Sequence, residues 1–179
     1  MGLALGATSL SFDFRVEGDQ LESTVSLHSP GSSRVQLDRR SRVEPDLNVL
    51  ALDYFDEQIT WERWTVQDEG FVSKRNHHCA TKDGISVTTF VQRHLDSVAR
   101  VMLTGGVAVD ADTRNAYRRF ATRGGGLTFG GDYAPPMPVS VLYDLGRSAD
   151  GIARMPSAVI EIGGRRKTVR WERVEPRPL

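Results

Sequence analysis

The side chains best suited to metal or nucleophile chemistry are His77, His78 and Cys79, with His94 further along the chain. Imidazole and thiolate are ligand types that suit zinc. The spacing matches no zinc finger or ribbon, and adjacent histidines in a strand point to opposite faces, so at most one histidine joins Cys79. A Cys–His nucleophile pair needs a third, orienting group, and the sequence identifies none. We expect exposed histidines and a half-buried cysteine at a strand end, with no metal and no cofactor.

Acidic side chains gather where two predicted strands, residues 47–55 and 58–66, would form a hairpin. These side chains are Asp53, Asp56, Glu57 and Glu62. Paired carboxylates can act as acid and base when their environments separate their pKa values, and Asp53 would lie near Glu62 in this hairpin. We favour a charged hairpin tip, because charges concentrate on exposed turns. If the protein were an enzyme, its candidate catalytic residues would be Tyr54, Glu62, His78 and His94.

A glycine-rich stretch covers residues 124–131 and continues into a proline-rich stretch that ends at Pro138. Glycine loops that bind phosphate lie between a strand and a helix, whereas this stretch follows a predicted helix and leads into prolines. We interpret residues 124–138 as a long loop, an arm that reaches a neighbouring chain. The tail over residues 175–179 is extended because its prolines prevent both helix and strand, and we expect it to touch a partner too.

Basic side chains form three groups, which a nucleic-acid-binding protein would need to bring onto one face. The groups are Arg39, Arg40 and Arg42; Arg114, Arg118, Arg119 and Arg123; and Arg165, Arg166 and Lys167. The chain has 23 basic and 23 acidic residues and a net charge of zero, which argues against nucleic acid. Residues 1–100 hold 11 basic and 15 acidic side chains and residues 101–179 hold 12 and 8, a dipolar distribution that suits contacts between copies.

The elements that would position these side chains are mostly strands. Apolar and polar residues alternate over residues 8–28 on either side of a turn at 17–20, which predicts a hairpin. Further strands are predicted over residues 34–38, 47–55, 58–66, 71–75, 85–91, 138–145, 158–162 and 167–174.

The segment from residue 82 to residue 122 combines ambiguous and helical signals. Residues 82–84 are typical of a hairpin turn. Residues 91–103 place apolar residues at helical spacing but follow a β-branched run, and we favour a strand because two glycines come next. Residues 110–122 predict a helix, with Asp110 as its N-cap and Asp112 in its first turn.

The predicted elements define a mainly β domain with a minor helical part. About nine strands point to an antiparallel β-sandwich or barrel with one or two helices packed on it, in a single domain over residues 1–179. Trp61 and Trp64 face opposite sides of one strand, so if Trp61 is core, Trp64 faces outward, where tryptophan favours an interface. The residues that we expect at interfaces are Trp64, Tyr133, Arg114 and Arg118.

The composition is that of a folded protein, because hydrophobic residues are 39% and charged residues 26% of the 179 residues. The single cysteine, Cys79, excludes an intrachain disulfide. No stretch approaches the roughly 20 apolar residues of a membrane helix, and the first residues lack the basic flank of a signal peptide. We expect a cytoplasmic protein, or one assembled into a particle in the cytoplasm, with no membrane partner.

Three functions of different classes are open at this stage. The first is a non-catalytic structural or interaction protein, a subunit of a larger homo- or hetero-oligomeric assembly such as a phage-like particle, which Trp64 and the arm at residues 124–138 favour. The second is a small-molecule-binding β-barrel enzyme of the cofactor-free isomerase or cyclase type. The third is a nucleic-acid-binding module. We predict identical or different protein subunits as partners, keep a small-molecule ligand open, and expect no nucleic acid.

Overall fold

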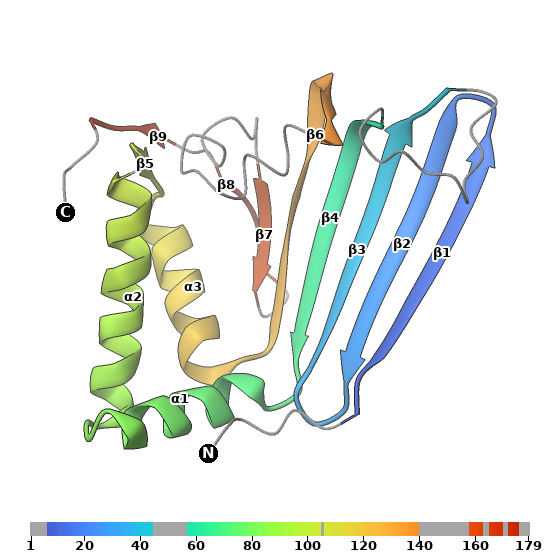
Figure 1. Ribbon diagram of the computed structural model, residues 1–179. Coiled ribbons are helices and arrows are strands. Elements are labelled where there is room, and N and C mark those ends of the chain that lie inside the picture. Colours follow the sequence, from blue (N-terminus) through green and yellow to red (C-terminus); the bar gives the residue numbers. More distant parts are fainter. Residues whose placement is uncertain are drawn as a thin grey trace.

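The computed structural model describes residues 7–44, 57–104, 106–139, 158–162, 165–169 and 172–175 (Figure 1). The strands are β1 (Ser9–Glu17), β2 (Gln20–Ser29), β3 (Ser33–Arg42), β4 (Gln58–Asp68), β5 (Val107–Ala108), β6 (Gly126–Pro138), β7 (Ala158–Ile162), β8 (Arg165–Val169) and β9 (Glu172–Arg173). The helices are α1 (Phe71–Lys82), α2 (Val87–Thr104) and α3 (Ala111–Arg123).

The main sheet is antiparallel and runs in the order β1-β2-β3-β4-β6, continued by β7 and β8. The predicted hairpin over residues 8–28 is confirmed: β1 and β2 pair along their whole length around Gly18, whose φ of 61° favours glycine. The prediction of a mainly β protein is also confirmed. Neither closure into a barrel nor a β-sandwich is seen among the described residues, because the hydrogen-bonded order is open from β1 to β8.

The three helices lie together on one side of the sheet, and α3 contacts β7 (Figure 1). The prediction of one or two helices is therefore wrong. The α3 helix begins as predicted, because the Asp110 carboxylate accepts the backbone N–H of Thr113 at 2.7 Å. The α1 helix is tied to α3 by the buried Asn76, whose Nδ2 donates to the carbonyl of Ala121 at 3.0 Å.

The strands predicted at residues 71–75, 85–91 and 91–103 are helical instead. Gly84 adopts a positive φ of 64° at the end of α1, a position that glycine occupies at helix ends as well as in hairpins. Ser86 then caps α2, because its hydroxyl accepts the N–H of Thr89 at 3.1 Å. The helical spacing over residues 91–103, with Val91 buried, outweighs the β preference of the β-branched residues before it.

The segment predicted as a glycine- and proline-rich arm, residues 124–138, is mostly strand β6, which pairs antiparallel with β4 of its own chain. The backbone of β4 approaches Gly130 so closely that a Cβ there would lie 2.1 Å from the carbonyl oxygen of Glu62, so this position of β6 requires glycine. The strand ends in a small core formed by Ile59, Tyr133 and Val139, with Met137 against it. Of the predicted tail, only Glu175 lies within the described residues.

Candidate functional site

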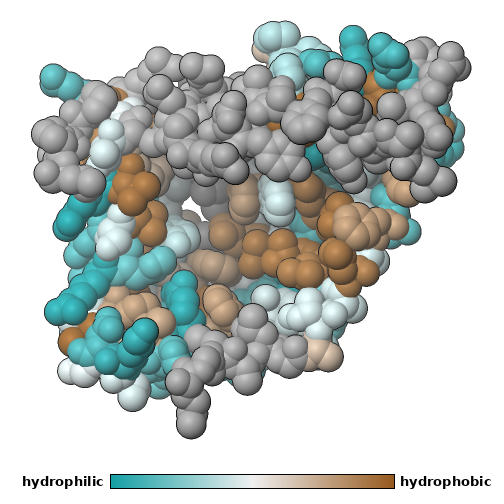
Figure 2. All heavy atoms as spheres, viewed as in Figure 1, coloured by the Kyte–Doolittle hydropathy of each residue, from teal (hydrophilic) through white to brown (hydrophobic). Residues whose placement is uncertain are grey.

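One face of the five strands β1, β2, β3, β4 and β6 is apolar over most of its width. The register aligns a first row consisting of Leu10, Leu27, Val35, Val66 and Leu127. It aligns a second row consisting of Phe12, Val25, Leu37, Trp64 and Phe129. Residues paired across a ladder share a face of the sheet, so these rows form one continuous surface, which we call the apolar face. Figure 2 shows apolar side chains gathered across the middle of the sheet.

The opposite face of the same strands is polar. One of its rows pairs Asp13, Thr24 and Asp38 with Arg63. Partial burial would raise the pKa of Asp38, but hydrogen bonds from Gln36, Arg63 and Thr24 outweigh burial and lower the pKa below its ordinary value. The sheet is therefore strongly two-sided, with one face suited to water and the other to a covering layer.

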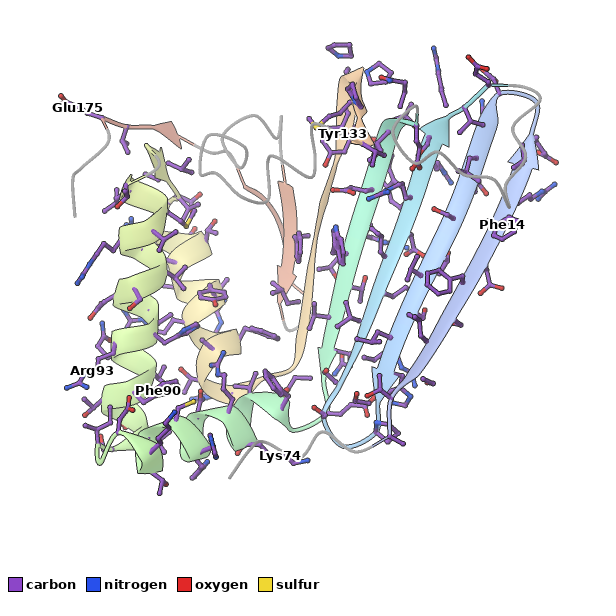
Figure 3. All side chains as sticks on the ribbon, in the orientation of Figure 1. Phe14, Lys74, Phe90, Arg93, Tyr133 and Glu175 are labelled. Carbon is purple, nitrogen blue, oxygen red and sulfur yellow. The ribbon has the colours of Figure 1, made fainter. Side chains whose placement is uncertain are left out.

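The apolar face is uncovered at the β1 end. The exposed fractions are 55% for Leu10, 61% for Phe12, 54% for Phe14 and 41% for Leu27. At the opposite end Trp64 is half-buried and stacks on Phe129, with ring centroids 6.1 Å apart and planes 8° from parallel. Figure 3 shows Phe14 on the outermost strand, far from Phe90 on α2. The helices therefore leave the β1 end of the apolar face without cover from the described residues.

A buried polar network lies next to the two apolar rows, on the same face. Its central residue is Arg39, which β3 places opposite Glu62 of β4. Arg39 Nη2 lies 3.4 Å from Glu62 Oε2, and Arg39 Nη1 lies 3.6 Å from Glu57 Oε2. Tyr133 donates its hydroxyl hydrogen to Glu62 Oε1 at 2.8 Å, and the Ser41 hydroxyl donates to Glu57. The network thus joins β3, β4 and β6.

The side chains of this network are mostly buried. Glu57 and Glu62 are 5% and 3% exposed, and the Arg39 side chain is 18% exposed. Burial raises the pKa of Tyr133 far above its ordinary value, and the charge and hydrogen bond of Glu62 raise it further, against the opposing effect of Arg39. The phenol therefore stays protonated and serves as a donor. We infer a network that holds strands in register, because both carboxylates, the phenol and the terminal nitrogens of Arg39 have partners in it, and only Arg39 Nε lacks one.

The structure places three of the residues considered above for metal or nucleophile chemistry on one helix. His77, His78 and Cys79 all belong to α1, where successive side chains are about 100° apart, so the strand geometry predicted for them is wrong. His77 is exposed, and its Nδ1 lies 2.9 Å from the Ser73 carbonyl. Among the residues with described side chains, no three His, Cys, Asp or Glu groups are placed to share a metal ion.

The candidate catalytic residues fall into separate clusters. His94 lies between α2 and α3, where its Nε2 is 3.0 Å from the Tyr117 hydroxyl and its ring stacks on Phe90. Burial, aided by the nearby charge of Arg75, lowers the pKa of His94. Glu62 belongs to the network in the sheet instead. His78 is half-buried on α1, and Tyr54, with Asp53 and Asp56, lies outside the described residues.

The predicted interface residues differ in their surroundings. Tyr133 is buried within its own chain, and Trp64 is on the apolar face. Trp61 does lie on the opposite face, where the guanidinium of Arg40 is 5.3 Å from its ring. Arg114 and Arg118 are exposed and belong to helix α3, whereas the basic group of Arg39, Arg40 and Arg42 belongs to strand β3 of the sheet.

Sequence reasoning missed the two features that define this surface. The alternation in residues 8–16 indicated an apolar face, but only the position of β1 at the edge of the sheet shows that Phe12 and Phe14 are uncovered. The sequence predicts a hairpin tip for Glu57 and Glu62 and a basic loop for Arg39, whereas the register brings all three together. No signal short of the strand register could have joined them.

Comparison of the sequence with known protein families, curated proteins and solved structures finds no match. Within the described part of the chain, none of the helices combines the length and the hydrophobicity needed to cross a bilayer.

Proposed function

We propose that this protein is a non-catalytic interaction protein that functions as a subunit of a larger assembly, and that it associates through the β1 end of the apolar face. The observation that carries this proposal is the exposure of Leu10, Phe12 and Phe14, each more than half exposed on a single strand. Large apolar side chains that are adjacent and uncovered mark interaction sites, whereas isolated ones need no explanation.

The physical argument is the free energy of covering these side chains. Complete burial of a leucine or phenylalanine side chain contributes about 1.5–3 kcal/mol. Because about half of each side chain is still exposed, covering Leu10, Phe12, Phe14 and Leu27 would contribute roughly 3–6 kcal/mol per chain. A long apolar strand at the edge of a sheet is also prone to pair with another chain. Both effects favour association.

The buried network supports a binding role rather than a catalytic one. Glu62 is neutralised by Arg39 and hydrogen-bonded to Tyr133, and His94 contacts Tyr117 in a different part of the fold. Acid–base catalysis needs such groups to converge on one reacting atom. The hydrogen bonds and ion pairs of the network keep β3, β4 and β6 in register, and this register keeps the apolar face continuous.

The test is the native mass of the purified chain, measured by light scattering over a hundredfold range of concentration. We expect species larger than the 19.9 kDa chain, and we expect the double variant F12S/F14S to dissociate at concentrations where the wild type stays associated. The matched control is Val101→Ser, since Val101 is 63% exposed on α2, away from β1. A wild type that is monomeric at every concentration contradicts the proposal, as does equal dissociation of the control variant.

A further inference from the structure

We propose that the partner at β1 is a second copy of this chain, whose own β1 pairs with it in antiparallel fashion around a two-fold axis that passes through Phe14. This inference rests on the proposed function and adds the identity of the partner and the register of the contact. It is carried by three properties of β1: the direction of its backbone groups, the direction of its apolar side chains, and the order of its charges.

The backbone of β1 is ready to accept another strand. The hairpin closes at the pair Glu17–Gln20, which flanks a two-residue turn and so exchanges hydrogen bonds. Alternation along the ladder then directs the N–H and C=O groups of Arg15, Asp13 and Ser11 toward β2. The same groups of Phe14 and Phe12 point to the open edge, where no described strand pairs with them. A strand added there would satisfy these groups, as in other cases of β-strand addition.

Matching the two faces limits the register. If the two-fold axis passes through a residue, every cross-strand pair joins residues an even number of positions apart, which lie on the same face of the sheet. Apolar residues then meet apolar residues, and the apolar face continues into the second copy. Such an axis at the middle of β1 would pass through Phe12, Asp13 or Phe14. The axis through Asp13 places two Asp13 carboxylates directly opposite each other, which destabilises the contact.

The charges select between the two remaining registers. With the axis at Phe14, Asp13 of each copy lies opposite Arg15 of the other, which gives two complementary pairs. Both residues direct their amides to β2, so across the new contact they form the pairs whose side chains approach most closely. With the axis at Phe12, Asp13 lies opposite Ser11 and gains no opposite charge.

The side chains needed for this contact are accessible in the single chain. Phe14 would meet Phe14 of the second copy, and Phe12 would meet Val16, so both exposed phenylalanines of β1 gain an apolar cross-strand neighbour. Arg15 contacts Glu17 of its own strand, but the two side chains are 70% and 69% exposed, and such surface pairs contribute little. Arg15 can therefore turn to the second copy at little cost.

Charge reversal tests the register without changing the apolar residues. Asp13→Arg alone, or Arg15→Asp alone, makes both cross-strand pairs repulsive, so we expect each variant to weaken self-association by roughly tenfold or more. Mixing the D13R chain with the R15D chain restores both complementary pairs, so we expect the mixture to associate about as tightly as the wild type. Sedimentation velocity measures the dissociation constants of the wild type, of each variant and of the mixture, and circular dichroism confirms that the variants are folded.

The outcomes separate this inference from the proposed function. If the wild type associates and F12S/F14S dissociates, but the two charge variants behave like the wild type, self-pairing in this register is refuted and the interaction function stands. Tight association of D13R with the wild-type chain would move the axis to Asp13 and also refute the register. Failure of the D13R and R15D mixture to recover association refutes it as well. A monomeric wild type refutes both.

Discussion

Replacing Arg39 with methionine removes the guanidinium that bridges Glu57 and Glu62 while keeping an unbranched apolar stem. The two carboxylates are 5% and 3% exposed, so they would be left buried beside each other without the opposite charge. Breaking a buried ion pair from one side costs about 3–5 kcal/mol. We expect Arg39→Met to lower the free energy of unfolding by about this amount, a large share of the total stability of a domain.

Urea denaturation followed by circular dichroism measures this change. With an m-value of roughly 3 kcal/mol per molar, the midpoint should fall by about 1–1.7 M. The control is Arg63→Met: Arg63 is 52% exposed in its 3.1 Å pair with Asp38, which keeps its hydrogen bonds from Gln36 and Thr24, so the loss should be no more than about 1 kcal/mol. The triple variant R39M/E57Q/E62Q should recover part of the loss, because it removes the uncompensated charges. A loss below about 1 kcal/mol for Arg39→Met would refute the buried network.

Three further predictions concern the helical part. Asn76→Ala removes one of the two donors to the buried carbonyl of Ala121, the other being Arg75 Nη2 at 3.3 Å, and should cost about 0.5–1.5 kcal/mol in urea denaturation. Asp110→Ala removes the N-cap of α3 and should cost about 0.5–2 kcal/mol by the same measurement. Burial and Arg75 lower the pKa of His94 below its ordinary 6.5. The neutral imidazole therefore contributes stability that is fully present above pH 6.5 and is lost as the pH falls below that value. We expect His94→Gln to flatten the resulting pH dependence of the melting temperature.

Each of these predictions has a result that contradicts it. A loss for Asn76→Ala no larger than that of His77→Gln, at an exposed position of the same helix, would mean that the link between α1 and α3 carries no weight. An unchanged midpoint in Asp110→Ala would contradict the capping role. A pH dependence in His94→Gln as steep as in the wild type would show that other groups cause it.

Local signals in the sequence predicted the elements that depend on neighbouring residues. The alternation on either side of Gly18 predicted the β1–β2 hairpin, and Asp110 predicted the start of α3. The two-stranded hairpin of β7 and β8 falls near the strands predicted at residues 158–162 and 167–174. In each case one short segment contains both the pattern and its physical cause.

The remaining features depend on contacts between distant residues. The turn at Asp83 and Gly84 fits both a hairpin and a helix end, and the packing of α2 on its neighbours decides between them. The glycines of β6 resemble a loop until Gly130 is seen against the backbone of Glu62. Arg39 and Glu62 are far apart in sequence, so their pairing follows from the strand register and from nothing local.

Residue-resolved hydrogen exchange as a function of protein concentration tests the central claim, association through the edge of β1, most directly. The amides of Phe12 and Phe14 point away from β2, whereas those of Asp13 and Arg15 point toward it. We predict that Phe12 and Phe14 exchange quickly in dilute solution and become strongly protected as the chain associates, while Asp13 and Arg15 are protected throughout. Exchange of Phe12 and Phe14 that is equally fast at every concentration would contradict the account.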